Sequence, residues 1–173
     1  MITVTADPGV DTGLVLWPDL RQDINAPLCH PIEIATCSMP HVGFWELRAR
    51  VLFDRIMDYM AKWKPECLIV EDQALWGGKL KSYTAGVQGD LFKLSHVAGM
   101  LLAGGYMYGC VVRLIPVITW KGQLPKSVTK ARCMKFCKDE FMRNSHVADA
   151  VGMGYSIQGV LKGDSKIWPI TQK

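Results

Sequence analysis

Apolar and polar residues alternate with a period of two in three short segments near the N-terminus. These segments cover residues 2–6, 13–17 and 32–37, and such alternation predicts β-strands that bury one face. The turn sequence Asp7-Pro8-Gly9 follows the first segment, so we expect the first two strands to form an antiparallel hairpin. The chain is therefore predicted to begin with a β-meander.

Helical and strand patterns alternate along the rest of the chain. Residues 44–63 place apolar side chains at a period near 3.6 and Pro65 ends the pattern, which predicts an amphipathic helix. The continuous apolar run at 67–70 predicts a strand buried on both faces, and residues 110–115 predict another buried strand. Further helices are predicted at 83–102, 127–141 and 146–158.

Capping residues mark where the last two helices begin. Ser127 is the expected N-cap of one, and Asn144 or Ser145 of the other, because their side chains accept from free backbone N–H groups. Residues 117–126 are expected to form a loop. The order of elements predicts a three-layer α/β fold with a mixed five-stranded sheet flanked by helices. No linker or repeat divides residues 1–173, so we expect one domain whose polar tail frays after about residue 159.

Residues 94–112 carry no formal charge and approach the roughly 20 residues that a membrane span needs. Gly99, Gly104, Gly105 and Gly109 interrupt this stretch, so we expect a buried helix, a glycine turn and a strand, and no membrane association. The six cysteines form no C-x2-C pair and the chain shows no secretory signal. They are predicted to be reduced thiols of a cytoplasmic protein.

The charges divide the chain into an acidic and a basic half. Residues 1–78 have a net charge of −5 and residues 79–173 a net charge of +9, although 49% hydrophobic and 21% charged residues are ordinary for a globular protein. A basic half is typical of polyanion binding, and a few inward-facing acids are typical of a metal site. A solvated basic face without a partner would give the same pattern.

Four acidic or histidine residues lie at positions where metal-binding or catalytic side chains are expected. Asp7 and Glu71 end predicted strands, and ligand sites in α/β sheets lie at the carboxyl ends of strands. His146 and Asp149 are three residues apart at the start of the last helix and therefore share a face. If they converge, three carboxylates and an imidazole favour two divalent ions, Mg²⁺ or Mn²⁺, and phosphodiester chemistry. Each residue alone also fits an ordinary role in a turn or a helix cap.

The combination resembles a known family. Asp7-Pro8-Gly9 with Thr12-Gly13, then Ile69-Val70-Glu71, then His146-Val147-Ala148-Asp149-Ala150 are similar to the motifs of RuvC-like Holliday junction resolvases. The resemblance is strongest to compact bacteriophage and bacterial members and spans residues 2 to about 158. Residues 120–126 also resemble the lysine-bearing loop before the third helix of those enzymes.

The resemblance implies a fold, an activity and a site. The fold would be RNase H-like, and the enzyme a homodimer that nicks opposed strands of four-way DNA junctions. Two Mg²⁺ or Mn²⁺ ions would bind Asp7, Glu71 and Asp149, with His146 at a fourth position that is acidic in some members. The setting would be DNA recombination and repair, or phage DNA processing, in the bacterial cytoplasm.

Basic and aromatic residues supply candidate DNA contacts. The predicted set is Trp76, Lys79, Lys81, Lys121, Lys126 and Lys130, because lysines contact phosphates and indoles stack on unpaired bases. For Trp120 we expect a core or loop anchor instead. The small residues of the 83–102 helix, with Phe92, Met100 and Leu101, make it the candidate dimer seam.

Three other functions compete with junction resolution. The first is another two-metal RNase H-like DNA nuclease that acts on flaps or branched DNA, or resembles a terminase. The second is a non-catalytic junction-binding module, although clustered acids without a metal destabilise a fold. The third is an actin-like ATPase, for which 173 residues are too few.

Overall fold

The strands that the structure describes form one mixed five-stranded sheet, as predicted. The computed structural model describes residues 1–20, 27–72, 90–122, 124–138, 142 and 144–161. In these residues the strand order is β3-β2-β1-β4-β5, and the strands are β1 (Thr3–Asp7), β2 (Asp11–Trp17), β3 (Glu33–Ser38), β4 (Cys67–Asp72) and β5 (Val111–Pro116). The first three pair antiparallel, whereas β4 is parallel to both β1 and β5. The meander and the crossover strands are thus confirmed.

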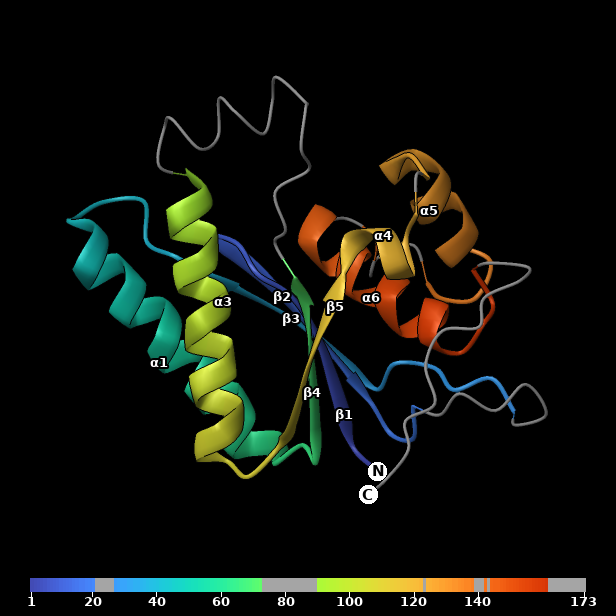
Figure 1. Ribbon diagram of the computed structural model, residues 1–173, viewed down its shortest axis with the longest axis horizontal. Helices are drawn as coiled ribbons and strands as arrows, with labels where there is room; N and C mark the ends of the chain where they lie inside the picture. Colours follow the sequence, from blue (N-terminus) through green and yellow to red (C-terminus); the bar gives the residue numbers. More distant parts are fainter. Residues whose placement is uncertain (21–26, 73–89, 123, 139–141, 143, 162–173) are drawn as a thin grey trace.

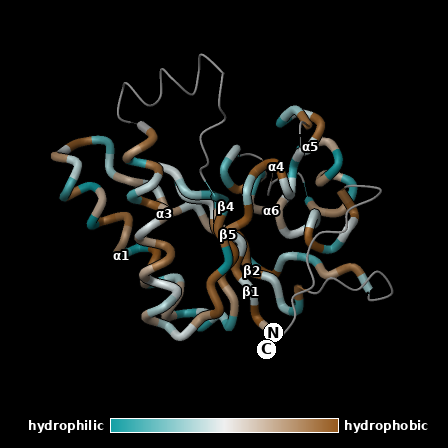
Figure 2. The backbone as a smooth tube through the Cα atoms, viewed as in Figure 1, coloured by the Kyte–Doolittle hydropathy of each residue, from teal (hydrophilic) through white to brown (hydrophobic). Residues whose placement is uncertain are grey.

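Helices cover both faces of the sheet and complete three layers (Figure 1). One face carries α1 (Trp45–Trp63) and α3 (Asp90–Met107), and the other carries α4 (Val117–Trp120), α5 (Lys126–Cys133) and α6 (Ser145–Ile157). Hydrophobic and hydrophilic residues alternate along α1 in Figure 2, and its buried side chains recur at helical spacing, at Ala49, Leu52, Ile56, Tyr59 and Met60. The amphipathic helix predicted at 44–63 is therefore confirmed.

The alternation of side chains along β1 and β4 decides which residues reach each layer. Val4 and Ala6 join the core under α1 and α3, so Thr5 and Asp7 point to the opposite face. On β4, Ile69 belongs to the core under α6, and Glu71 follows it on the same face. Both acids therefore lie on the side of the sheet that α6 covers.

Three predictions between residues 110 and 141 are wrong. β5 is not buried on both faces: Val111 is 51% exposed, because β5 is an edge strand. The predicted 117–126 loop contains the short helix α4. Ser127 is not an N-cap, because α5 begins one residue earlier behind Pro125, whose fixed φ suits a helix start, and it ends at Cys133.

The predicted glycine turn after residue 102 is also wrong, because α3 continues to Met107. A Cβ at Gly104 would meet Met57 Cε at 2.1 Å, and one at Gly105 would meet Val112 Cγ2 at 2.7 Å. These glycines therefore let α3 lie close to α1 and the sheet, and the turn comes at Gly109, which has a φ of +71°. The part of the predicted helix before residue 90 lies outside the described residues.

Two further expectations concern the thiols and the apolar segment. All six cysteines are free thiols, and Cys29 and Cys137 are only half-buried. No helix within the described ranges is long and apolar enough to cross a membrane. Of the side chains predicted at a dimer seam on α3, Leu101 is fully buried within the chain and Phe92 is exposed.

Candidate active site

Asp7 and Glu71 lie side by side because their strands are neighbours. Ala6 of β1 pairs with Val70 of β4 in parallel register, so the next residue on each strand is one of the two acids. Both carboxyl groups are buried, as is that of Asp149 on α6. Residues from three distant segments thus meet at the carboxyl ends of β1 and β4, where an α/β sheet usually carries its site.

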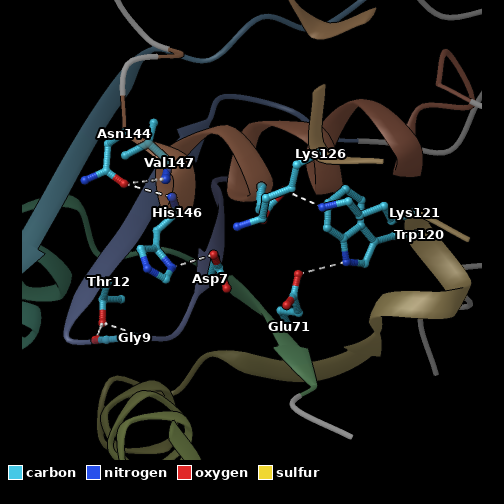
Figure 3. A network of polar contacts seen from close by, with 11 residues as sticks. Asp7, Gly9, Thr12, Glu71, Trp120, Lys121, Lys126, Asn144, His146 and Val147 are labelled. Atoms are coloured by element: carbon cyan, nitrogen blue, oxygen red, sulfur yellow. Dashed lines mark hydrogen bonds and ion pairs between the residues drawn. The ribbon is translucent and has the colours of Figure 1, made fainter. Parts of the chain in front are cut away.

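The first turn of α6 brings His146 to Asp7. Nδ1 of His146 lies 2.8 Å from Oδ2 of Asp7, and Figure 3 shows the imidazole pointing at that carboxylate. The Asn144 side chain accepts hydrogen bonds from the N–H groups of His146 and Val147, which confirms the predicted N-cap. The cap fixes where α6 begins and hence where its imidazole points.

Two glycines of the β1–β2 hairpin make room for this turn of α6. A Cβ at Gly13 would lie 2.5 Å from the backbone carbon and oxygen of His146. A Cβ at Gly9 would lie 2.7 Å from the imidazole itself. Only residues without a side chain permit so close an approach, so the Asp-Pro-Gly turn and Gly13 position the helix as well as the acid.

Two lysines neutralise Asp149. Nζ of Lys121 lies 2.8 Å from Oδ1, and Nζ of Lys126 lies 2.8 Å from Oδ2. Lys121 is buried with its partner, whereas the Lys126 side chain is 59% exposed. The first lysine is therefore part of the interior of the site, and the second lies at its rim.

Glu71 accepts a hydrogen bond from an indole. Nε1 of Trp120 donates a hydrogen bond to Oε2 of Glu71 over 3.1 Å, as Figure 3 shows. Trp120 is fully buried, so the expectation of a core anchor is confirmed. Its contact with the acid was not predicted, because nothing in the sequence indicates which polar atom a buried indole reaches.

The acids strongly affect one another's protonation. Burial raises the pKa of Glu71 to about 8, and the negative charges of Asp7 and Asp149 contribute to this shift. Burial also raises the pKa of Asp7, although the hydrogen bond from His146 acts to lower it. That hydrogen bond in turn raises the pKa of His146. Burial alone would lower the pKa of Lys126, but the hydrogen bond to Asp149 and the negative charges of the three acids together outweigh it and raise the pKa.

We expect Glu71→Gln to stabilise the chain in the absence of divalent cations. The folded-state pKa of Glu71 lies above its unfolded value of 4.5. Ionisation of Glu71 therefore lowers the free energy of unfolding progressively between about pH 4.5 and 8, and by a constant amount above that range. The amide oxygen still accepts from Trp120, while the buried charge is removed. In urea unfolding with EDTA, the variant should gain about 1–3 kcal/mol at pH 9 and much less at pH 5.

Asp72→Asn is the matched control for this experiment. Asp72 follows Glu71 on β4 but points to the other face by strand alternation. Its substitution should change the unfolding free energy by less than about 0.5 kcal/mol at both pH values. A Glu71→Gln variant no more stable than wild type at pH 9 would contradict the buried, charge-repelled environment of Glu71.

A cavity of about 150 Å³ opens beside the acids. It lies between the starts of α5 and α6, and its lining includes Lys126, Ser127, Lys130, Ser145 and Asp149. Lysine and serine side chains suit an anionic oxygen, and the carboxylate of Asp149 is already neutralised. The cavity therefore offers an anion a place directly next to the carboxylate cluster.

The structure brings together the four predicted site residues, Asp7, Glu71, His146 and Asp149. Among the described residues, however, no three His, Cys, Asp or Glu side chains are placed to hold a metal ion. Asp7 instead pairs with His146, and Asp149 pairs with two lysines. Of the predicted DNA contacts, Lys121 faces Asp149, and Lys126 and Lys130 line the cavity. Trp76, Lys79 and Lys81 lie outside the described residues.

Comparison with known proteins identifies the fold. No protein-family model and no curated protein sequence matches the chain. A structure of Thermus thermophilus RuvC matches with a TM-score of 0.66 and 18% identity, over 90% of this chain and 92% of that one. T. thermophilus RuvC in complex with a Holliday junction substrate matches with a TM-score of 0.66 and 17% identity, over 94% and 96%. The chain thus has the RuvC-like, RNase H-like fold predicted from its sequence.

Proposed function

We propose that the chain is a structure-specific endonuclease that resolves four-way DNA junctions with divalent cations. The observation that carries this proposal is the convergence of Asp7, Glu71 and Asp149, which lie far apart in the sequence, at one end of β1 and β4. The fold on which they converge matches that of an enzyme solved with a Holliday junction substrate. The match covers nearly the whole chain, which supports a single nuclease domain over residues 1–173.

The chemistry of the site fits a pair of Mg²⁺ or Mn²⁺ ions. Asp7, Glu71 and Asp149 would hold them, with His146 as the fourth donor, because hard divalent ions prefer carboxylate oxygens. Burial and then repulsion from Asp7 and Asp149 raise the pKa of Glu71, and a bound cation would offset both costs of the ionised carboxylate. When bound, such ions supply Lewis acidity toward a phosphodiester.

The lysines of the site would then exchange partners. A cation and an ammonium group compete for the same oxygens of Asp149, so cation binding requires at least one lysine to leave. Lys126 has the exposed side chain and lines the cavity, together with Lys130. We infer that Lys126 leaves Asp149 when either a cation or DNA binds and then contacts a DNA phosphate, while buried Lys121 stays near Asp149.

The DNA would lie along the basic side of the α5–α6 layer. Lys126 and Lys130 flank the cavity there, and the proposal also includes Trp76, Lys79 and Lys81 on the segment that follows β4. Two opposed cuts in a four-way junction are related by a two-fold axis, which a homodimer supplies. The enzyme would act in DNA recombination, repair or phage DNA processing in the cytoplasm of a bacterium.

Junction binding should weaken with salt through Lys126 and Lys130. Each phosphate contact contributes about 0.9 to the slope of log affinity against log salt on duplex DNA. Lys126→Ala and Lys130→Ala should each make the slope shallower by about that amount when binding is measured with EDTA across 50–200 mM salt. Lys130→Ala is the cleaner variant, because Lys126→Ala also removes a partner of Asp149.

Lys62→Ala is the matched control for Lys126→Ala. The Lys62 side chain is 58% exposed and pairs with a carboxylate, that of Glu33. It lies on α1, however, on the other side of the sheet. The slope should not change in Lys62→Ala, and unchanged slopes in both cavity variants would place the DNA elsewhere.

A cleavage panel tests the proposed function. The substrates are a four-way junction, a plain duplex and a flap of the same sequence, each incubated with Mg²⁺, Mn²⁺ or EDTA. We expect cleavage of the junction with either metal and none with EDTA. Preferred cleavage of the flap would indicate another branched-DNA nuclease, and tight junction binding without any cleavage would indicate a binding module.

A further inference from the structure

Trp120 contacts two of the elements that carry the acids, β4 and α6. It ends α4, which follows directly on β5, and β5 pairs with β4 so that Ile115 lies opposite Glu71. Nε1 donates to Oε2 of Glu71 over 3.1 Å. The indole N–H is a donor only, so this contact orients the carboxylate and adds no ligand to the site.

The indole itself is held in place from α6. Ser156 Oγ donates to the backbone oxygen of Trp120 over 2.7 Å. The ring packs on Gly152, where a Cβ would lie 2.9 Å from Cζ3. Gly152 is three residues beyond Asp149 on the same helix. A shift of the indole therefore changes the position of Glu71 relative to Asp149.

We propose that Trp120 is a positioning residue that sets the orientation of the Glu71 carboxylate for cation binding. This inference rests on the proposed function and extends it to a residue that touches neither cation nor DNA. Partners that orient a metal ligand typically change metal affinity or activity by about 10- to 100-fold when they are removed. Trp120 thus acts through Glu71.

Trp17 provides a matched control for a substitution of Trp120. Both indoles are fully buried and belong to the same core cluster. Both pack on a glycine of α6, Trp17 on Gly154 and Trp120 on Gly152. Nε1 of Trp17 also donates one buried hydrogen bond, but to the hydroxyl of Thr5, over 2.9 Å. The two positions therefore differ chiefly in whether the acceptor is a carboxylate of the site.

The test compares Trp120→Phe with Trp17→Phe in the full-length chain. Mn²⁺ binding is measured by electron paramagnetic resonance without DNA, and single-turnover junction cleavage is measured across Mg²⁺ concentrations. We expect Trp120→Phe to weaken Mn²⁺ binding about 10- to 100-fold and to raise the Mg²⁺ requirement similarly. Trp17→Phe should leave both within about threefold of wild type while losing comparable stability in urea.

A second variant covers the case in which Trp120→Phe does not fold. Gly152→Ala keeps the indole but places a methyl group against its ring, so it should weaken Mn²⁺ binding in the same direction. If Mn²⁺ binding in the folded Trp120 or Gly152 variant equals that of Trp17→Phe, the inference is overturned and the proposed function stands. If wild type binds no Mn²⁺ and cleaves no junction, the proposed function is overturned and the inference with it.

Discussion

Asp7→Asn, Glu71→Gln and Asp149→Asn should each reduce Mg²⁺-dependent junction cleavage by more than about 100-fold. Removal of a residue that only orients a ligand costs up to about that much, and these substitutions remove the ligands themselves. The affinity for the junction, measured with EDTA, should stay within about threefold of wild type, because Lys126 and Lys130 remain. Single-turnover cleavage and fluorescence anisotropy measure the two quantities on the same preparations.

Asp72→Asn is the control for these variants, as it changes an adjacent carboxylate on the opposite face of β4. It should cleave at nearly the wild-type rate. If a variant of Asp7, Glu71 or Asp149 retained most of the wild-type cleavage rate, the substituted residue would not be a cation ligand. Loss of junction binding together with cleavage would point to a change in the fold.

Gly13→Ala should both destabilise the protein and reduce cleavage. The new Cβ would lie 2.5 Å from backbone atoms of His146, and backbone cannot rotate away as a side chain can. The start of α6 would have to move, at a cost of about 1–3 kcal/mol. Because Asp149 moves with that helix, cleavage should fall by about 100-fold, the usual effect of a displacement near 1 Å. Urea unfolding and single-turnover cleavage check the two effects.

Gly99→Ala is the corresponding control in a helix that does not contact the site. Gly99 is exposed on α3, and a Cβ there would meet no atom within 4 Å. Alanine should therefore stabilise the chain by about 0.5–1 kcal/mol through its helix propensity, as measured by urea unfolding. If Gly13→Ala behaved like Gly99→Ala, the close approach of α6 to the hairpin would not matter for the site.

Periodicity and turn chemistry were sufficient to predict the sheet, α1 and the start of α6. Apolar alternation and the Asp-Pro-Gly turn are local signals, and they identified the strands that carry Asp7 and Glu71. The burial of β5 was predicted wrongly because a mostly apolar segment does not reveal whether its strand lies at an edge of the sheet. The extension of α3 through Gly104 and Gly105 was missed because its cause, close packing on Met57 and Val112, is tertiary.

Sequence reasoning predicted the acidic residues of the candidate site but not the groups that pair with them. Strand ends and helical spacing gave Asp7, Glu71, His146 and Asp149 from local sequence. The pairing of Lys121 with Asp149 and of Trp120 with Glu71 depends on how α4 packs between β5 and α6. Lysine in a basic segment suggested DNA contact for Lys121, whereas the fold buries it against an acid.

The most direct test of the central claim is the nature of the cleavage products. A four-way junction labelled on each strand in turn is incubated with Mg²⁺, and the resolved duplexes are then treated with a DNA ligase. The proposed function predicts nicks at symmetry-related positions on two opposed strands, leaving ends that the ligase seals. Cuts at unrelated positions, equal cutting of plain duplex or cleavage that persists in EDTA would contradict it.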